Sequence, residues 1–353
     1  MSLQTVWFIL IAVLWIGYFI LEGFDFGVGM LLRVVAKTNA ERRALISTLG
    51  PLWDGNEVWL LVAGGATFAA FPEWYATLFS GFYLPLLLIL VALMIRGVAF
   101  EYRSKHGDSQ WRDRWDWAIS ISSFLPALLW GVAFANIVRG VPLETSAQGH
   151  IEYAGAFFNL LNPFALLGGV VTLTLFLTHG ALFISLKTDG AIRQRAHALA
   201  GKMGLVAAVA AVAFLLWAQM AYSTKAWTWI PVALAAGSWL VALGQDRLER
   251  DGLAFLFSSF TMLFAVVSLF GMLYPNVMPN IDRALPGLDI HNAASTDYTL
   301  KVMTYVAVFF TPIVLVYQTW TYWIFRKRMT AEQIPTPDFG TLGLPEVSKD
   351  SAR

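Results

Sequence analysis

Ionisable side chains inside long apolar segments are the residues of this sequence that could do chemistry. Glu22 and Asp25 lie within the first apolar run, and Asp54 and Glu57 lie at the start of the second. Each pair is spaced i,i+3, which places both carboxyls on one face of a helix. Charged groups at such positions are costly and are functional candidates by default. Because carboxyls can gain and lose protons, the pattern indicates a proton path.

Arg96 and Glu101 extend this group, since both lie at the end of the third apolar run. Four buried carboxyls and one guanidinium cannot all be charged without a cost of several kcal/mol. At least one carboxyl is therefore expected to hold a proton near neutral pH. The spacing leaves a second interpretation open, in which the acids pair with Arg96 or with an arginine of a partner subunit and only hold helices together.

Histidine and cysteine usage limits the cofactors that this chain could ligate. Of the five histidines, His179 alone lies within an apolar run, and there is no cysteine. Bis-histidine haem ligation, iron–sulfur clusters on cysteine and haem attachment through CxxCH are therefore excluded. His179 is a weak candidate for a single axial ligand, and a structural hydrogen-bonding role is the more common one for such a residue. No HExxH motif and no nucleotide-binding loop is present, and no metal site is expected.

The composition indicates an all-α polytopic membrane protein. The 353 residues are 58% hydrophobic and 13% charged, whereas soluble domains carry about 25% charged residues. The mean hydropathy is +0.62. A net charge of +1 excludes a basic nucleic-acid binder.

A membrane span needs about 20 mostly apolar residues, and this criterion predicts nine transmembrane helices. The segment Phe71–Tyr75 is predicted to be a tight turn between the second and third spans. The predicted spans are 6–33, 51–70, 76–100, 116–138, 161–186, 200–222, 227–245, 253–273 and 301–325.

The basic residues predict the orientation of these spans. With the N-terminus outside and the C-terminus in the cytoplasm, the outer side holds Arg139, Lys225, Arg283 and Lys301, and Arg96 lies within a span. The other 19 of the 24 Lys and Arg fall on the inner side, as the positive-inside rule requires.

The same assignment divides the chain into a bundle and a tail. Residues 1–328 form a single transmembrane bundle, and residues 329–353 form a polar cytoplasmic tail. Two outer loops, at 139–160 and 274–300, are long enough to be structured. The second is rich in Pro, Asn and Asp, and we expect an ordered cap or docking surface there.

Several long blocks resemble subunit II of the cytochrome bd ubiquinol/menaquinol oxidases. The likeness extends over most of the chain, and the GFD and WDGN motifs occur in the order found in that family. The blocks are GFDFGVGML at 23–31, ERRALISTLGPLWDGNEVWLLVAGGATFAAFPEWYATLFSGFY at 41–83, RGVAFEYRSK at 96–105, WRDRWDWAISISSFLPALLWGVAFANIVRGVP at 111–142 and FNLLNPFALLGGVV at 158–171.

The resemblance implies a subunit of a respiratory terminal oxidase in a bacterial or archaeal cytoplasmic membrane. Such a complex oxidises ubiquinol or menaquinol and reduces dioxygen to water with proton uptake from the cytoplasm. Two haems b, one haem d and the quinol-oxidation loop belong to subunit I, the expected heterodimer partner. Some members hold a structural quinone in subunit II, and small single-span accessory subunits are further expected partners. The chain is not expected to be catalytic alone.

The resemblance also assigns roles to individual residues. The WDGN aspartate, here Asp54, lies in a proton path from the cytoplasm towards the haems. Asp25 and Arg96 match buried positions near the subunit contact. Glu22 and Glu101 stand where the family often has Asp, so the acid is kept. Some members have Gln at the position of Glu57, which weakens a proton role there.

Two rival functions remain open from the sequence. A proton-coupled secondary transporter would also carry intramembrane acids, but it would show an internal repeat and broken helices near the bilayer midplane. A purely structural assembly subunit would use the same acids to bind a partner. Exchanging Asp54 or Asp25 for an amide would then change the yield of the complex and not its rate.

Overall fold

A computed structural model describes residues 1–330 of the chain as a bundle of long helices. In this range the α-helices are α1 (Leu3–Val35), α2 (Asn39–Leu49), α3 (Trp53–Ala70), α4 (Pro72–Gly81), α5 (Tyr83–Tyr102), α6 (Ser109–Arg139), α7 (Pro163–Lys187), α8 (Gly190–Ala221), α9 (Trp229–Arg247), α10 (Asp251–Leu273) and α11 (Asp297–Ile324). The short elements are β1 (Leu143–Thr145), β2 (Ile151–Tyr153), η1 (Phe157–Leu160), η2 (Ala226–Thr228), β3 (Asn276–Met278) and β4 (Leu288–Asp289).

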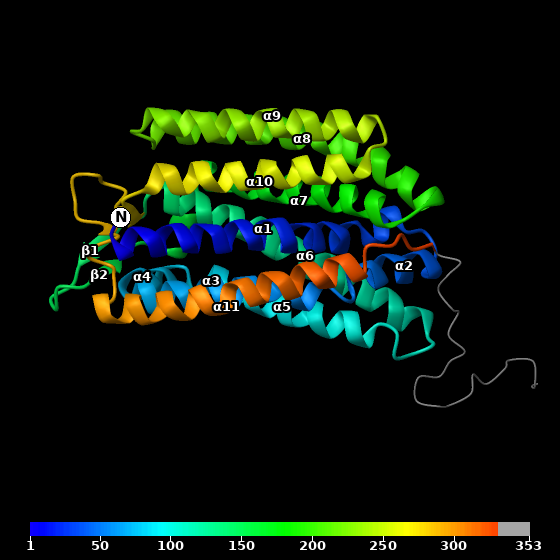
Figure 1. Ribbon diagram of the computed structural model, residues 1–353, viewed down its shortest axis with the longest axis horizontal. Coiled ribbons are helices and arrows are strands. Elements are labelled where there is room, and N and C mark those ends of the chain that lie inside the picture. Colours follow the sequence, from blue (N-terminus) through cyan, green and yellow to red (C-terminus); the bar gives the residue numbers. More distant parts are fainter. Residues whose placement is uncertain (331–353) are drawn as a thin grey trace, which may run out of the picture.

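Helix α1 lies in the middle of the bundle (Figure 1). It contacts α3, α6, α7 and α10, while α8 and α9 lie on one side and α5 and α11 on the other. The two acids of α1 are therefore held in the interior, where side chains of several helices can reach them.

Helices α1 and α7 approach each other closely along their backbones. A methyl group at Gly27 would overlap the carbonyl oxygen of Phe176 and lie 2.7 Å from Cα of Gly180. Gly23 similarly faces the Phe176 ring. These glycines let two helices approach closely, as small residues do in membrane bundles. The glycines around Asp25 thus pack a helix of the same chain.

Local sequence explains where several helices begin. Asp108 and Asn162 accept hydrogen bonds from the first-turn N–H groups of α6 and α7. Thr38 and Glu41 form a capping box at the start of α2. Pro72 occupies the first position of α4, where its missing N–H costs nothing.

Within residues 1–330, eight helices are long and apolar enough to cross a membrane: α1, α5, α6, α7, α8, α10, α11 and the helical segment 226–247 that contains α9. Helix α3 matches the predicted second span, but its polar first turn makes its 18 residues too polar on average for this set. The structure therefore confirms a multi-helix membrane bundle, and the count of nine spans stays a prediction.

The predicted third span, 76–100, is wrong as a single helix. Helix α4 ends at Gly81, and α5 begins at Tyr83, so the helix is interrupted at Phe82. Phe82 is 1% exposed and lies in the core next to Tyr153 of β2, 6.2 Å between ring centroids. The segment Phe71–Tyr75, predicted to be a tight turn, is instead largely the first turn of α4, and α2 was not predicted at all.

The two long loops form an ordered cap at the end of the bundle where α1 begins (Figure 1). Strands β1 and β2 pair antiparallel, as do β3 and β4. The side chain of Asn280 donates to the carbonyl of Leu143 at 2.8 Å, and Arg283 donates to the carbonyls of Val138 and Arg139. The expected order of the second loop is confirmed.

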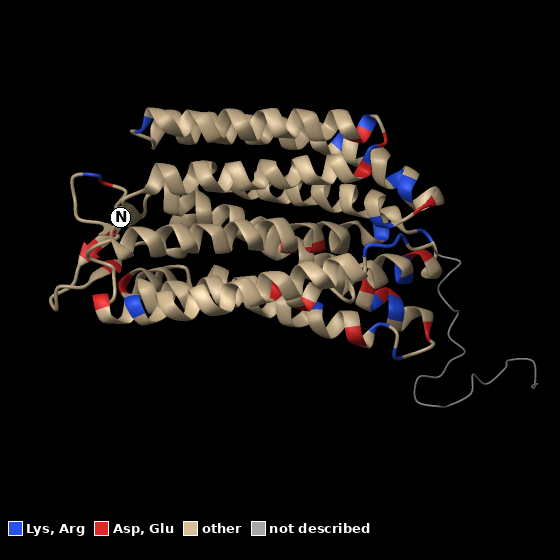
Figure 2. Ribbon diagram, in the orientation of Figure 1, with Lys and Arg blue, Asp and Glu red and all other residues tan. Residues whose placement is uncertain are grey.

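Charged residues lie mostly at the two ends of the bundle, and Lys and Arg gather at the end opposite the N-terminus (Figure 2). A few acids remain in the middle of the bundle, and these define the site described next. The predicted tail begins at residue 329, and its residues 331–353 lie outside the described residues.

Candidate functional site

Four elements meet around the acids of α1. Glu22 and Asp25 are both fully buried. Glu22 faces Arg96 of α5, whereas Asp25 faces Asn56 of α3. The two acids that the sequence places on one helix face thus have different partners, and α11 completes the site from the far end of the sequence.

The first half of the site is an ion pair between Glu22 and Arg96. Nη2 of Arg96 contacts Oε1 of Glu22, and both side chains are fully buried. Oε2 of Glu57 lies 3.9 Å from the same nitrogen. The guanidinium also lies 4.6 Å from the centre of the Phe26 ring. A single positive charge is therefore shared between two carboxyl groups and an aromatic face.

The second half is a chain of hydrogen bonds that begins at Asp25. The amide nitrogen of Asn56 donates to Oδ2 of Asp25 at 2.7 Å. The amide oxygen of Asn56 accepts from the hydroxyl of Tyr322 at 2.7 Å and from Nε2 of Gln318 at 3.4 Å. Trp59 donates to Gln318 at 2.8 Å. Helices α1, α3 and α11 are thereby connected through polar side chains.

Several buried polar atoms of this site have no hydrogen-bond partner within residues 1–330. They are Oδ1 of Asp25, Oε2 of Glu22, and Nε and Nη1 of Arg96. Unpaired buried polar groups are rare and costly, so each such group calls for an explanation. A carboxyl with one bonded and one unbonded oxygen can accept or release a proton at the unbonded one.

Asp54 and Glu101 lie away from this buried group. Asp54 is exposed on the first turn of α3, and Glu101 is exposed near the end of α5. Glu57 lies between the two settings, with 20% of its side chain exposed. Of the six predicted acid and arginine residues, the structure brings four together and leaves Asp54 and Glu101 at the edge.

The sequence did not single out Tyr322 and Gln318 for this site. They lie more than 260 positions after Asn56, and a tyrosine near the end of a span matches the aromatic belt expected at a membrane surface. The weak signal was Gln318, a polar amide within the last apolar run.

His179 has a complete set of partners inside the bundle. Its Nδ1 lies 2.7 Å from the hydroxyl of Ser258, and its Nε2 lies 3.1 Å from the carbonyl oxygen of Ile20. Phe255 stacks on the imidazole at 4.5 Å between ring centroids. An axial metal bond would have to replace one of these contacts. Within residues 1–330, no group of three His, Asp or Glu could hold a metal ion.

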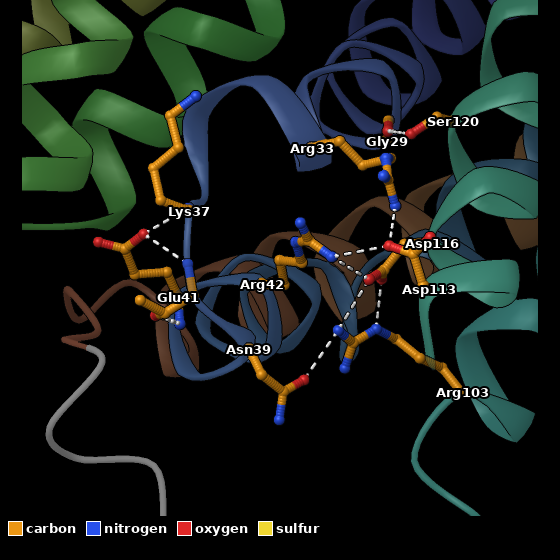
Figure 3. A network of polar contacts seen from close by, with 11 residues as sticks. Gly29, Arg33, Lys37, Asn39, Glu41, Arg42, Arg103, Asp113, Asp116 and Ser120 are labelled. Atoms are coloured by element: carbon orange, nitrogen blue, oxygen red, sulfur yellow. Dashed lines mark hydrogen bonds and ion pairs between the residues drawn. The ribbon is translucent and has the colours of Figure 1, made fainter. Parts of the chain in front are cut away.

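A second polar network lies at the basic end of the bundle (Figure 3). Asp116 of α6 is fully buried and accepts two hydrogen bonds from Arg103, at 2.5 and 3.1 Å. Arg42 of α2 lies 2.9 Å from Asp116 and 3.5 Å from Asp113. Arg33 of α1 also pairs with Asp113. These contacts join the ends of α1, α2, α5 and α6.

An apolar cavity of about 170 Å³ lies between α6, α7, α8, α9 and α10. Phe134, Phe214, Trp239 and Met262 are among its walls. The hydroxyl of Thr172, one of the few polar groups in the lining, donates to the carbonyl of Ala127 at 2.6 Å. The cavity thus suits a hydrocarbon chain better than a polar ring.

Comparison with known proteins decides the family. Residues 3–325 match the sequence profile described as cytochrome bd terminal oxidase subunit II. The chain belongs to this family. It is therefore a component of a quinol oxidase complex and a multi-pass membrane protein.

Individual members of the cytochrome bd subunit II family match over nearly the whole chain. Cytochrome bd ubiquinol oxidase subunit 2 of Bacillus subtilis is 41% identical, covering 94% of this chain and 98% of its own. Cytochrome bd-I ubiquinol oxidase subunit 2 of Escherichia coli K12 is 39% identical, covering 94% and 96%. The fold matches a chain of the bd oxidase structure from Geobacillus thermodenitrificans with a TM-score of 0.74, at 17% identity over 92% of this chain and 97% of that one.

Proposed function

We propose that this chain conducts protons from the cytoplasm into a bd-type oxidase and scaffolds its haem-bearing subunit I. The complex would oxidise quinol, reduce dioxygen to water and separate charge without pumping. The arrangement around α3 supports the proposal, because α3 carries an exposed acid in its first turn and packs against α1, which carries two buried acids. Asp54 is exposed, Glu57 is partly buried, and Asp25 and Glu22 are fully buried.

The chemistry of the path follows from the partners of these acids. Asp54 would collect a proton at the surface, and Glu57, three residues later, lies on the same helix face. Arg96, shared by Glu57 and Glu22, would stabilise one carboxylate at a time and so limit the charge held in the interior. Asn56 orients Asp25 through the bond from its amide nitrogen. Glu101, exposed on α5, would adjust the local potential.

The proposed orientation places the basic end of the bundle in the cytoplasm. Lys and Arg gather at that end in Figure 2, which favours this orientation under the positive-inside rule. Helix α3 spans about 27 Å, from 18 residues at 1.5 Å each. With α3 as the ninth crossing, the N-terminus lies outside and the C-terminus inside.

The proposed partner face is formed by α3, α5 and α11. Helix α11 buries only Leu300 among its own residues, although it crosses the whole bundle. On the same side, Glu57, one turn further into α3 than Asp54, is partly uncovered. Carboxyl groups facing lipid are unfavourable, so a polar protein surface is the better neighbour. Subunit I, with two haems b and haem d, would cover this face, and single-span accessory subunits are further candidates.

A structural quinone would bind to this chain through the isoprenoid tail of the quinone. The apolar cavity between α6 and α10 offers aromatic and aliphatic walls to an isoprenoid chain. The polar ring would have to lie outside it, since the Thr172 hydroxyl already bonds within the chain. Bound quinone of this kind would brace the helices and is distinct from the quinol substrate.

Single-residue exchange in the intact complex tests the proton path. Asp54→Asn and Glu57→Gln should each lower oxygen consumption per assembled complex by at least about tenfold, since positioned proton transfer contributes about 10²–10⁴. Glu152→Gln, at an exposed acid of β2 at the opposite end of the bundle from Asp54, is the matched control and should keep most of the rate. Normal turnover per complex, with a reduced yield, would instead support a purely structural subunit.

A further inference from the structure

A second site lies in the polar network at the basic end of the bundle, away from the buried acids of α1. There a cavity of about 560 Å³ opens between the ends of α2, α5 and α6. Its size falls in the range of small-molecule pockets, roughly 300–1,000 Å³. The charged residues that line it are Arg42, Arg103, Arg112, Arg114, Asp113 and Asp116.

The charges around this cavity do not balance. Four arginines face two aspartates, so two positive charges remain in the lining. Arg33, at the end of α1, lies outside the lining but also pairs with Asp113 and so offsets part of its negative charge. The cavity therefore favours an anion, and guanidinium groups bind phosphate oxygens with paired hydrogen bonds.

The hydrogen bonds of Arg103 indicate where in the cavity an anion would bind. Its side chain is 1% exposed and lines the cavity. Nε and Nη2 bond to Asp116, and Nη2 also donates to Asn39 at 3.0 Å. Nη1 has no hydrogen-bond partner among the described residues, and neither does Nε of Arg42. Two arginines that line the cavity thus each keep one buried nitrogen without a partner, and Figure 3 shows both side chains converging on Asp116.

Backbone donors do not explain the site. Asp108 already accepts hydrogen bonds from the N–H groups of Gln110 and Trp111 at the start of α6. The side-chain donors that line the cavity at this end of α6 are those of Arg112 and Arg114, together with Ser109 and Gln110.

The surroundings place the cavity at the level of lipid headgroups. Trp117 and Tyr102 are each 52% exposed next to it. Arg33 lies 4.5 Å from the centre of the Trp117 ring, and Trp111 donates to the carbonyl of Tyr102. Exposed Trp and Tyr mark the membrane–water interface, where basic pockets between helices bind anionic headgroups.

We propose that this cavity binds a phosphate group, supplied by the headgroup of an anionic phospholipid. Arg103 and Arg42 would contact the phosphate from the interior, and Arg112 and Arg114 from the rim. A bound headgroup would hold α2, α5 and α6 together at the end where the acid-bearing helices begin or finish. This site is independent of the proposed proton path.

Lipid binding to the purified, delipidated complex tests the proposal. The variant is Arg112→Gln with Arg114→Gln, which keeps the Arg103–Asp116 pair and so the fold. The matched control is Arg247→Gln with Arg250→Gln, two exposed arginines at the turn between α9 and α10. Native mass spectrometry would follow bound phosphatidylglycerol, with phosphatidylcholine as a neutral lipid and inorganic phosphate as a soluble competitor.

The expected result is a loss of one tightly bound phosphatidylglycerol, with at least tenfold weaker affinity, in the cavity variant and not in the control. Displacement of that lipid by millimolar inorganic phosphate would keep the phosphate site and assign it to a soluble ligand. Equal phosphatidylglycerol affinity in wild type, variant and control would overturn the proposal. So would equally tight binding of phosphatidylcholine at the same position.

Discussion

Glu22 and Asp25 lie three residues apart on α1, yet their energetics differ. Glu22 forms a buried ion pair with Arg96, whereas Asp25 accepts a hydrogen bond from the neutral amide of Asn56. Removing one partner of a buried ion pair leaves a bare charge, while removing a neutral donor leaves an unsatisfied acceptor. Substitutions at the two sites should therefore fail in different ways.

At the ion pair, Glu22→Gln should destabilise the complex by about 3–5 kcal/mol, because Arg96 then stays buried without a counter-charge. The double variant Glu22→Gln with Arg96→Gln removes both charges and should recover most of that loss. Thermal unfolding of the purified complex measures both. A double variant no more stable than the single one would contradict the proposed pairing.

At the amide, Asn56→Ala should cost about 1–3 kcal/mol, since Oδ2 of buried Asp25 loses its donor. Tyr322→Phe removes a single bond to the other side of the same amide and should cost about 0.5–1.5 kcal/mol. The same unfolding measurement compares them. If Tyr322→Phe were the more harmful change, the Asn56–Asp25 bond would not be the main support of this site.

At the scale of elements, the contact between α1 and α7 depends on glycine. Gly27→Ala should shorten the lifetime of the assembled complex at raised temperature, because the new methyl group meets the backbone of α7. Gly237→Ala is the matched control on α9, on the opposite side of the bundle from the proposed partner face, where nothing lies within 4 Å of the added carbon. It should be neutral or favour the helix by about 1 kcal/mol. Similar lifetimes for both variants would show that α7 shifts readily to make room for the added methyl group.

Helix α2 is held to α8 by a contact that should depend on pH. Burial alone would raise the pKa of Glu41, but hydrogen bonds from the N–H of Lys37, from Arg195 at 2.5 Å and from the N–H of Thr38 outweigh it and lower the pKa below its usual 4.5. A lowered pKa stabilises the folded state above pH 4.5, and that stability disappears as the pH falls through the lowered value.

Glu41→Gln should therefore flatten the loss of thermal stability between about pH 4.5 and about pH 3, the window below the usual glutamate pKa. Glu152→Gln, at an exposed acid of β2, is the control and should keep the wild-type slope. An unchanged slope in Glu41→Gln would mean that other carboxyls carry the acid sensitivity.

The sequence predicted the long helices best, because runs of about 20 apolar residues mark them. Long apolar runs located the membrane helices. The interpretation in which the acids pair with Arg96 holds for Glu22 and Glu57 and not for Asp25. The break at Phe82 was missed because the apolar run continues through it, although Gly81 and Pro85 flank it. Tyr322 reaches Asn56 only through tertiary packing of α11, and no local pattern contains that distance. Asp54 and Glu101 were grouped with the buried acids because spacing does not separate a buried helix face from an exposed one.

At the scale of the whole molecule, the direction of the bundle decides what the acids can do. The absence of cysteine makes this direct to measure. Gln148→Cys, in the loop between β1 and β2, should react with a membrane-impermeant maleimide in intact cells. Ser104→Cys, exposed at the basic end, should react only after the membrane is opened. The labelled chain is separated from its partner subunit by size on a gel.

The same result bears on the source of the protons. Asp54 lies in the first turn of α3, while the opposite end of α3 meets the cap formed by the two long loops, where the N–H of Ser295 donates to the carbonyl of Ala70. With Ser104 inside, Asp54 lies in the cytoplasmic half and can take protons only from that side. With Ser104 labelled in intact cells, the same acids would face outward, and a cytoplasmic proton path through them would be excluded whatever Asp54→Asn did to the rate. The labelling pattern therefore decides the orientation, and with it whether the protons of the proposed path can come from the cytoplasm.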